Sequence, residues 1–465
     1  MTLAERLADY ALATRYADLG RTTVTQLKLR LVDAAGCALG AYDEEPVKIA
    51  RRVALSESGR GVATLLGTEE KVPAELATFV NGLMVRYFDF NDTYLSKEPA
   101  HPSDNISACL AVAESEGASG KDLLAAAAVA YEVQCRLCDA ADIRHRGWDH
   151  VNYGLVSTSL AASALMGLDR KRAAQAVNIA LSGHIAMRQV RAGELSMWKG
   201  ASFANAARNG VFAARLAAEG MTGPSPIFEG EMGFFRQVSG TFRLDTERFG
   251  RQGRGFRVND TYIKYWPAEY HAQTAVWAAL EVRKKVRDPD EIEKVLVETH
   301  EAGYNILGKD REKWRPATKE TADHSLPFIV GMALLKGTVD NGTYSERNVS
   351  SREVLDYIRK VAVKEDRSLT ALYPSRGMAN RVTAVLRDGR RVSAEVVVPR
   401  GHPLDPMTRR DVEKKFLGLC GRVMGTRRAR EALEGLWETD ALGDAGDIPP
   451  LLRVGPERPE RPRNS

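Results

Sequence analysis

The first half of the chain consists of Ala-rich segments in which apolar residues recur every three or four positions. These segments follow one another from about residue 2 to residue 223 and are separated by Gly, Asn, Asp and Pro. This spacing is that of amphipathic helices, and small Ala side chains let helices pack closely. Ser119 and Asp122 have the spacing of a capping box, which predicts a helix through Cys138. Further helices are expected at 155–166, 170–181 and 202–219.

The hydrophobic pattern changes after a connector rich in Gly and Arg at 250–255. Residues 294–300 alternate between apolar and polar side chains, as in a β-strand. Residues 381–399 have the pattern of two strands joined by Asp388-Gly389, which is typical of a two-residue hairpin turn. The second half therefore predicts a sheet in addition to helices.

These patterns predict a mostly α fold, with a large all-helical domain and a smaller α+β lid domain. Helical periodicity returns at 408–419 and 426–437. We expect a ligand to bind in a cleft between the two domains. The expected divisions are 1–258 for the first part of the helical domain, 259–403 for the α+β lid, 404–440 for C-terminal helices that return to the helical domain, and 441–465 for a disordered tail.

Composition excludes several classes of protein. The 465 residues include 66 Lys and Arg and 61 Asp and Glu, a net charge of +5 that is too small for a nucleic-acid-binding protein. The long apolar stretch 123–131 is far shorter than the ~20 residues of a membrane span. Glu5, Arg6 and Asp9 interrupt what would be the apolar part of a signal peptide, so a cytoplasmic location is expected. The 5 Cys indicate reduced thiols.

Two fragments resemble parts of metal-binding motifs. Cys135-x-x-Cys138 lies in a predicted helix without a second pair nearby, so buried helix cysteines are the main alternative to a zinc or iron–sulfur site. His300-Glu301 begins like a zincin motif, but Tyr304 occupies the position of the second histidine. P-loop, nucleophile-elbow and dinucleotide-binding motifs are absent, which argues against nucleotide-dependent chemistry.

A loop between Arg86 and Asn105 concentrates polar and ionisable side chains. It contains Asp89, Asp92 and His101 and is stiffened by prolines. Two carboxylates and an imidazole could perform proton transfer. The alternative is a solvated surface loop with Asp92 or Ser103 as a helix cap, and composition alone does not separate the two interpretations.

Two lysines lie at predicted loop-to-helix junctions. Lys199 precedes a run of small residues, and Lys264 is followed by aromatic residues, Pro, Glu269 and His271. Cations at such junctions are consistent with a site for a multiply charged carboxylate substrate.

Several segments form an ordered set of motifs over about residues 5–435. They are Asp89 to Asn105, Leu195 to Gly210, Lys264 to Thr274, Thr321 to Pro327, and Asn380 to Thr383 with Gly401 to Pro403. Together they closely resemble the MmgE/PrpD family, whose best-known members are 2-methylcitrate dehydratases. The resemblance implies a helical domain with a smaller lid, a homodimer, and lyase chemistry on di- or tricarboxylates without a metal or other cofactor. Conversion of 2-methylcitrate to 2-methyl-cis-aconitate in propionate catabolism is the expected reaction.

The family motifs also imply roles for individual residues. The implied catalytic residues are Asp89, His101, His150, Lys199 and Lys264, and the implied substrate-binding residues are Thr93, Asp92, Glu269 and His271. The two lysines would neutralise substrate carboxylates, while the aspartate and the two histidines would move protons. Whether His271 or His324 reaches the substrate stays open.

Related activities remain as alternatives. Glu269 stands where the decarboxylase branch, which acts on cis-aconitate, carries a histidine, so this position resembles the dehydratase branch. Asn91 stands where many relatives have Asp, which leaves the role of a second carboxylate to Asp92. An epimerase of the iminodisuccinate type also remains open. A catalytically inactive helical scaffold or binding protein is disfavoured because the implied catalytic residues occur together.

Overall fold

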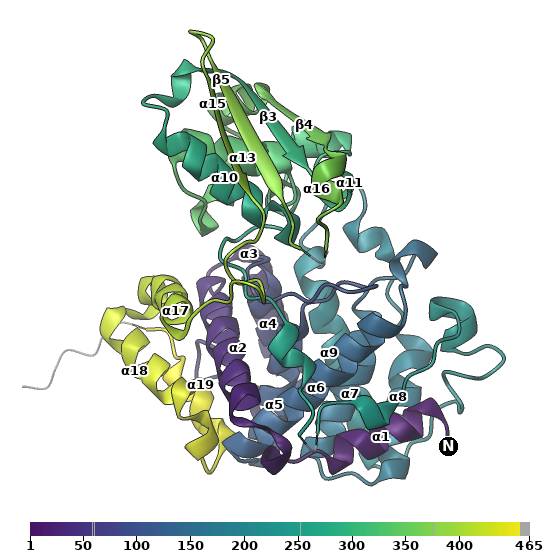
Figure 1. Cartoon of the computed structure of the whole chain (residues 1–465). Helices are drawn as coiled ribbons and strands as arrows, with labels where there is room; N and C mark the ends of the chain where they lie inside the picture. Colours follow the sequence, from purple (N-terminus) through teal and green to yellow (C-terminus); the bar gives the residue numbers. More distant parts are fainter. Residues whose placement is uncertain (58, 60, 252, 375, 456–465) are drawn as a thin grey trace, which may run out of the picture.

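The computed structural model describes residues 1–455 apart from residues 58, 60, 252 and 375 (Figure 1). The described residues form two hydrophobic cores. One core combines residues from Leu3–Ile263 with residues from Met407–Leu452. The other lies within Ala268–Leu386. The chain therefore builds most of a helical body, crosses into an α+β unit, and returns to the body. The fold is predominantly α with a smaller α+β part, as the sequence predicts.

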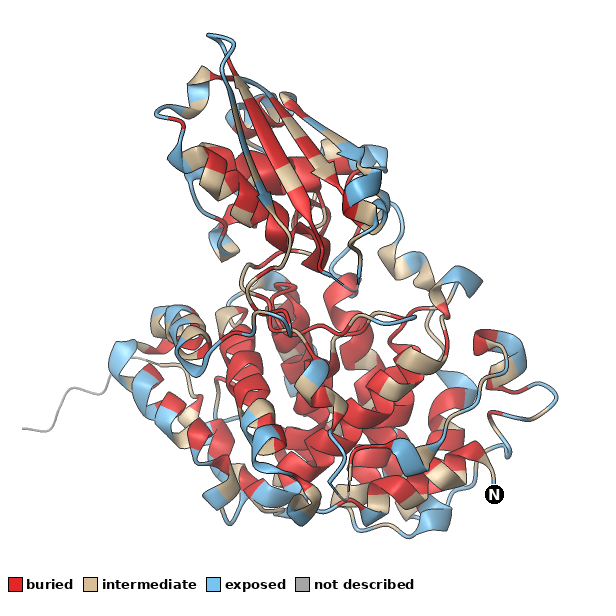
Figure 2. Ribbon diagram, in the orientation of Figure 1, coloured by how far each residue is buried: buried red, intermediate tan, exposed pale blue. Residues whose placement is uncertain are grey.

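The helical body is centred on α9 (Trp198–Ala218), which packs against both α4 (Ala74–Arg86) and α7 (Asn152–Leu165). These helices are largely buried (Figure 2). The predicted capping box at Ser119 is confirmed, because the Ser119 side chain accepts from the Asp122 amide and the Asp122 carboxylate accepts from the Ser119 amide. The other body helices are α1 (Leu3–Ala13), α2 (Arg21–Gly40), α3 (Glu45–Ser56), α5 (Ile106–Glu116), α6 (Gly120–Ala140), α8 (Arg170–Gly183), α17 (Arg409–Met424), α18 (Thr426–Trp437) and α19 (Ile448–Leu451).

The α+β unit is built on a four-stranded sheet of order β4-β3-β5-β6, in which only the β3–β4 pair is parallel (Figure 1). The predicted hairpin is confirmed as the antiparallel β5–β6 pair. Helices α10 (Gln273–Lys284) and α13 (Leu326–Lys336) pack against the sheet. The strands are β3 (Ile292–Thr299), β4 (Val361–Glu365), β5 (Asn380–Leu386) and β6 (Arg391–Val396), and the remaining helices are α11 (Glu301–Leu307), α12 (Lys319–Ala322), α14 (Glu346–Val349), α15 (Arg352–Ile358) and α16 (Arg367–Thr370).

A further small sheet lies in the body and pairs β1 (Ala63–Thr64) with β2 (Lys71–Val72). Among the described residues, none of the helices combines the length and apolar character of a membrane span.

The loop that follows α4 is held against the segment that enters the α+β unit. Thr93 and Tyr262 exchange two backbone hydrogen bonds of 2.8 Å. Lys415 on α17 donates to the backbone oxygens of Phe90, at 2.6 Å, and Lys264, at 3.0 Å. These bonds place the polar loop found in the sequence at the boundary between the body and the α+β unit.

The C-terminal segment differs from the expected disordered tail. Residues 441–455 are placed against the body, and Ala445, Ile448 and Leu452 are buried in its core. The Ala445 amide also donates to the Ala118 oxygen at 2.8 Å. The apolar residues in this segment pack into the core of the body. The proline content of the segment had suggested disorder. Residues 456–465 lie outside the described part of the chain.

Gly401 lies where the chain returns to the body, and its substitution should destabilise the fold more than that of another glycine of similar conformation. Gly401 has φ +97°, and an added Cβ would overlap the carbonyl oxygen of Ile263. Gly389, at the hairpin tip, has φ +85° with nothing near its Cβ position. Gly389→Ala should therefore lower the free energy of unfolding by only about 1–2 kcal/mol, because the backbone conformation at this position is unfavourable for Ala. Gly401→Ala should lower the free energy of unfolding by about 1–3 kcal/mol more than Gly389→Ala, because a steric clash is added.

Thermal unfolding of both variants beside the wild-type protein tests this expectation. Equal melting temperatures for the two variants would show that the contact with Ile263 relaxes freely.

Candidate active site

The carboxylate of Asp89 is surrounded by three cations. Its Oδ1 accepts from Arg86 Nη1 at 2.6 Å and Lys264 Nζ at 2.5 Å, and its Oδ2 lies 3.5 Å from Lys199 Nζ. All four side chains are at most 2% exposed. Burial alone would raise the pKa of Asp89, but Arg86, Lys264 and Lys199 together hold it well below the usual value. The carboxylate is therefore ionised at neutral pH.

The cations reach Asp89 from separate parts of the body and the crossing segment. Arg86 is the last residue of α4, Lys199 lies in the first turn of α9, and Lys264 precedes α10. Asp89 itself has φ +50°, a left-handed conformation that non-Gly residues seldom adopt. The surrounding ion pairs keep this residue in place despite the unfavourable backbone.

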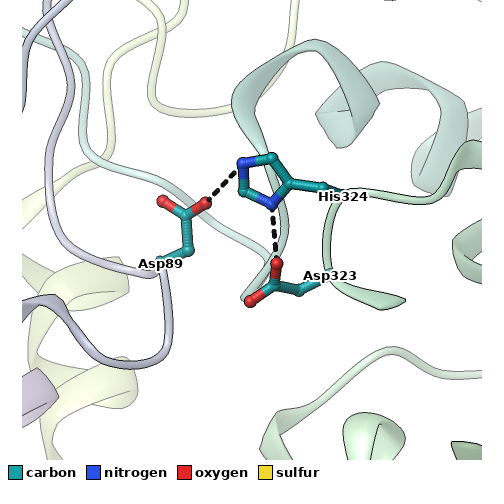
Figure 3. Close-up of side chains that lie close together, drawn as sticks. All are labelled: Asp89, Asp323 and His324. Atoms are coloured by element: carbon teal, nitrogen blue, oxygen red, sulfur yellow. Dashed lines mark hydrogen bonds and ion pairs between the residues drawn. The ribbon is translucent and has the colours of Figure 1, made fainter. Parts of the chain in front are cut away.

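The α+β unit adds Asp323 and His324, which lie between α12 and α13. The His324 ring lies between the carboxylates of Asp89 and Asp323 (Figure 3). Asp323 Oδ1 accepts from Lys199 Nζ at 2.8 Å and lies 2.6 Å from His324 Nδ1. His324 Nε2 lies 3.6 Å from Asp89 Oδ2. Lys199 thus bridges a carboxylate of each unit. Sequence analysis left His324 open and missed Asp323, although both lie in the Thr321 to Pro327 motif.

Asp89, Asp323 and His324 could in principle ligate a metal, since one ligand atom from each lies within 4.8 Å of the others. The two carboxylates, however, already neutralise buried cations, and a divalent ion would lie next to Lys199 and Lys264. Like charges so close in a buried site repel strongly. The electrostatics therefore favour an anionic ligand at this group rather than a metal.

Arg86 also connects Asp89 to His101. Arg86 Nη2 lies 2.9 Å from His101 Nε2, and His101 Nδ1 lies 2.8 Å from the Asp92 carbonyl oxygen. The carbonyl can only accept, so Nδ1 carries the proton and Nε2 accepts from Arg86. Burial and the Arg86 charge lower the pKa of His101 well below its usual value. His101 is a neutral ring with both nitrogens engaged. Sequence analysis did not assign a role to Arg86.

His150 is the imidazole next to His101, and the centroids of the two rings are 5.8 Å apart. Its Nδ1 lies 2.9 Å from Asp149 Oδ1. Its Nε2 is buried and has no hydrogen-bond partner among the described residues. Burial lowers the pKa of His150 to about 4, so the ring is neutral at pH 7.

The loop that carries Asp89 is not a solvated surface loop, because residues 87–94 are all buried. The Asp92 carboxylate accepts from the Ser103 amide and the Tyr131 hydroxyl, each at 2.8 Å. The Thr93 hydroxyl donates to the Ala100 oxygen at 3.0 Å. In this structure both side chains hold the loop in shape, although the resemblance implied that they contact substrate.

Asn91 has the same supporting function. Its amide donates to Ser103 Oγ at 2.9 Å and to Asp104 Oδ1 at 2.7 Å. Asp104 Oδ2 lies 3.9 Å from Arg86 Nε, and burial raises the pKa of Asp104 to about 7. A second carboxylate beside Arg86 is thus supplied by Asp104, a residue of the polar loop to which the sequence motifs assigned no role.

Glu269 and His271 lie on the crossing segment. The Glu269 carboxylate accepts from the His271 amide at 2.7 Å, which shapes the turn before α10. His271 Nδ1 is buried and has no hydrogen-bond partner among the described residues. Its ring packs against those of His300 and Tyr373, with centroids 5.0 and 5.5 Å away. His271 therefore has a polar atom available to a ligand, whereas Glu269 is engaged.

The partial metal motifs have structural functions. Cys135 and Cys138 are buried within α6, and burial raises the pKa of both thiols well above the usual value. His300 caps α11, where its Nδ1 accepts from the Gly303 amide at 3.0 Å. The interpretation of the cysteines as buried helix residues therefore holds.

A cavity of about 1210 Å³ lies at the boundary, lined by residues of both units. Lys319 lines this cavity, with Nζ 3.6 Å from the Tyr87 ring centroid and 4.4 Å from that of Phe88. Burial lowers the pKa of Lys319 to about 8. The charged lining residues are Asp43, Glu44, Glu194, Glu320 and Glu346 with Arg315, Lys319 and Arg422. Acidic residues predominate, which makes this cavity unfavourable for a polyanion.

Asp89→Asn should strongly destabilise the protein, because three buried cations would lose their shared carboxylate. Leaving buried charges unpaired costs roughly 3–5 kcal/mol. The double variant Asp89→Asn/Lys264→Met should recover part of this loss, because it removes one uncompensated cation. Chemical unfolding of the two variants and of Lys264→Met measures the coupling energy between Asp89 and Lys264.

The exposed variant Asp388→Asn is the control, and its free energy of unfolding should remain within about 0.5 kcal/mol of wild type. Strictly additive losses in the double variant would contradict this account.

The chain is similar in sequence to known proteins over most of its length. Residues 5–247 match the sequence profile of the MmgE/PrpD N-terminal domain, and residues 266–439 match that of the MmgE/PrpD C-terminal domain. The chain is 32% identical over 432 residues to 2-methylcitrate dehydratase of Escherichia coli K12, with 87% of each chain covered. It is 30% identical over 423 residues to 2-methylcitrate dehydratase of Cupriavidus necator, with 85% of each covered. A 2-methylcitrate dehydratase-like protein of Aspergillus oryzae is 29% identical over 438 residues, with 88% of this chain and 87% of that protein covered. The chain therefore belongs to the MmgE/PrpD family.

Proposed function

We propose that this protein is a hydro-lyase that dehydrates a 2-hydroxy tricarboxylate, with 2-methylcitrate as substrate and 2-methyl-cis-aconitate as product. The observation that carries the proposal is the convergence of Lys199 and Lys264 on Asp89, beside two neutral histidines. Family membership and the names of the similar dehydratases support the reaction class.

The net charge of the buried group suits a carboxylate ligand. Arg86, Lys199 and Lys264 contribute three positive charges, whereas Asp89 and Asp323 contribute two negative charges. Asp104 lies beside Arg86 and, with a pKa raised to about 7, is partly ionised and offsets part of the difference. The remaining positive charge, in a site of low dielectric, favours binding of an anion. Substrate carboxylates would replace the protein carboxylates as partners of Lys199 and Arg86.

Dehydration requires a base for a carbon-bound proton and an acid for the leaving hydroxyl, because hydroxide is a poor leaving group. Burial lowers the pKa of Lys264, although Asp89 opposes the shift. A lowered pKa makes the ammonium group a better proton donor near neutral pH. Lys264 is accordingly the proposed acid, and Lys199 and Arg86 are the proposed carboxylate partners.

Lys199→Met should reduce turnover of 2-methylcitrate by on the order of 100-fold or more, because a cation that stabilises developing negative charge is lost. Mass spectrometry of reactions with 2-methylcitrate, citrate, cis-aconitate and iminodisuccinate measures the activity and its specificity. Lys285→Met, which changes an exposed lysine, should retain wild-type turnover.

Other results of this assay would contradict specific parts of the proposal. Decarboxylation of cis-aconitate or epimerisation of iminodisuccinate as the fastest reaction would replace dehydration. Full activity of Lys199→Met would remove that residue from the mechanism. A chelator should leave turnover unchanged, and a loss that added Zn²⁺ or Fe²⁺ reverses would contradict metal-independent chemistry.

The proposal includes a cytoplasmic homodimer. Exposed apolar side chains on α3, Ile49 and Val53, and on α9, Trp198 and Phe212, support a subunit contact, because exposed apolar groups mark interaction sites. Phe212→Glu should shift the protein towards the monomer in size-exclusion chromatography with light scattering, since a buried charge weakens an apolar interface. Met221→Glu is the control, because it changes an exposed apolar residue beyond α9. A wild-type monomer would refute the dimer.

A further inference from the structure

We infer that Asp149 and Arg191 orient His150 so that its Nε2 is the atom that removes the proton from the substrate. The inference rests on the proposed dehydration and deepens it by naming the base. His150 is the catalytic residue in this assignment. Asp149 and Arg191 are positioning residues, because they act on the substrate only through His150.

The contacts around His150 form a continuous chain. Its Nδ1 lies 2.9 Å from Asp149 Oδ1, and Arg191 Nε lies 3.0 Å from Asp149 Oδ2. The Val151 amide also donates to Asp149 Oδ1, at 3.3 Å. Asp149 is fully buried, and His150 is 5% exposed. Arg191 Nε donates to Asp149 Oδ1 as well, at 3.3 Å. The ion pair with Arg191 holds the carboxylate beside Nδ1 and favours one orientation of the imidazole ring.

The segment that carries Asp149 is itself firmly held. The Asp149 amide donates to the Ala186 oxygen at 3.0 Å. Asn152, at the start of α7, donates to the same oxygen at 3.1 Å and accepts from the Ala186 amide at 2.7 Å. The Arg188 amide donates to the Gly147 oxygen at 2.9 Å, in the turn that also carries Arg191. The positioning residues therefore share one rigid support.

These contacts determine which nitrogen of His150 carries the proton. Burial raises the pKa of Asp149, but Arg191 and His150 lower it below the usual value, so this carboxylate is ionised and can only accept. The proton of the neutral ring is thus on Nδ1, and the lone pair is on Nε2. The other charged or titratable groups around the ring are Arg86 and His101, which add no acceptor for a second proton.

The free Nε2 distinguishes His150 from His101. A buried polar atom without a hydrogen-bond partner is unfavourable by about 1–3 kcal/mol and is uncommon in folded proteins. His150 Nε2 is such an atom, whereas His101 Nε2 is occupied by Arg86. A ligand that supplies hydrogen to Nε2 would satisfy the site. Of the two histidines, only His150 therefore has a lone pair available for proton removal in this structure.

The proposed step is balanced in atoms and electrons. His150 Nε2 takes the proton from the carbon next to a substrate carboxylate, and the electron pair of that C–H bond forms the C=C bond. The neighbouring C–O bond breaks, and its oxygen leaves as water with a proton from the Lys264 ammonium group. The imidazolium is stabilised by Asp149. His150 then loses its proton to water, and Lys264 regains a proton from water.

The surface pair Asp142 and His145 provides a matched control. Its carboxylate-to-Nδ1 distance is 2.5 Å, but the His145 side chain is 77% exposed. Asp149→Asn should lower kcat by on the order of 100-fold or more while KM changes less than about three-fold, because the orientation of the base is lost but the cations that bind substrate remain. Asp142→Asn should retain wild-type kcat. Asp149→Glu should recover part of the loss.

The pH profile gives a second signature. The acid limb of kcat/KM should lie near pH 4 in the wild-type enzyme, because the base works only when His150 is unprotonated. In Asp149→Asn this limb should move to lower pH, since the charge that favours the imidazolium is removed. A change in KM alone, or equal losses in Asp149→Asn and Asp142→Asn, would overturn the inference.

Nitrogen-15 NMR of the histidine rings tests the assignment without turnover. His150 should be in the Nδ1–H form at pH 7 in the wild-type protein and lose this preference in Asp149→Asn. An Nε2–H form in the wild-type protein would overturn the inference whatever the substrate. An Nδ1–H form without dehydration of any tricarboxylate would refute the proposed function and confirm the orientation of the ring. If Asp149→Asn does not fold, Arg191→Gln takes its place, and unchanged kcat and tautomer in that variant would exclude Arg191 as a positioning residue.

Discussion

The ion pairs of Asp89 hold the functional region of this protein together. One buried carboxylate contacts side chains from the end of α4, the start of α9 and the segment that crosses into the α+β unit. Each of these cations would be strongly unfavourable in the interior without a partner. The left-handed backbone at Asp89 is therefore tolerated because the position of its carboxylate satisfies several charges at once.

The same group joins the two units. Lys199 belongs to the body, but it also pairs with Asp323 of the α+β unit, whose neighbour His324 faces Asp89. A polyanion bound to Lys199 and Arg86 would displace the carboxylates of Asp89 and Asp323 from them. Binding of such a ligand would therefore be coupled to the contact between the units through the shared ion pairs.

Burial has opposite consequences for the carboxylates and for the imidazoles. Surrounding cations keep Asp89 and Asp149 ionised despite burial, whereas burial keeps His101 and His150 neutral. Neutral rings can act as bases only if a nitrogen is free, and the hydrogen-bond partners decide which one is. Arg86 occupies the second nitrogen of His101, while the corresponding atom of His150 has no partner among the described residues.

Local sequence patterns were sufficient for much of the fold and for part of the site. The Ser119 capping box and the hairpin at Asp388-Gly389 were predictable because their hydrogen bonds join residues close in the chain. The predominantly helical class followed from the spacing of apolar residues. The family motifs pointed to Lys199, Lys264 and other residues that do lie together, but they did not indicate which partner each would have.

Tertiary structure alone decided those partners, because they join residues that are distant in sequence. Lys199 and Asp323 are 124 residues apart, and Lys264 and Asp89 are 175 apart, so no local pattern could pair them. The packing of residues 441–455 on the body could not be predicted from the sequence either, because a short apolar segment becomes ordered only through contacts with a core formed by distant residues. The sequence by itself determined which chemical groups are present and which helices and strands carry them. Only the tertiary structure decided which carboxylates are shared and which imidazole nitrogen is left free, because charge and burial act through space rather than along the chain.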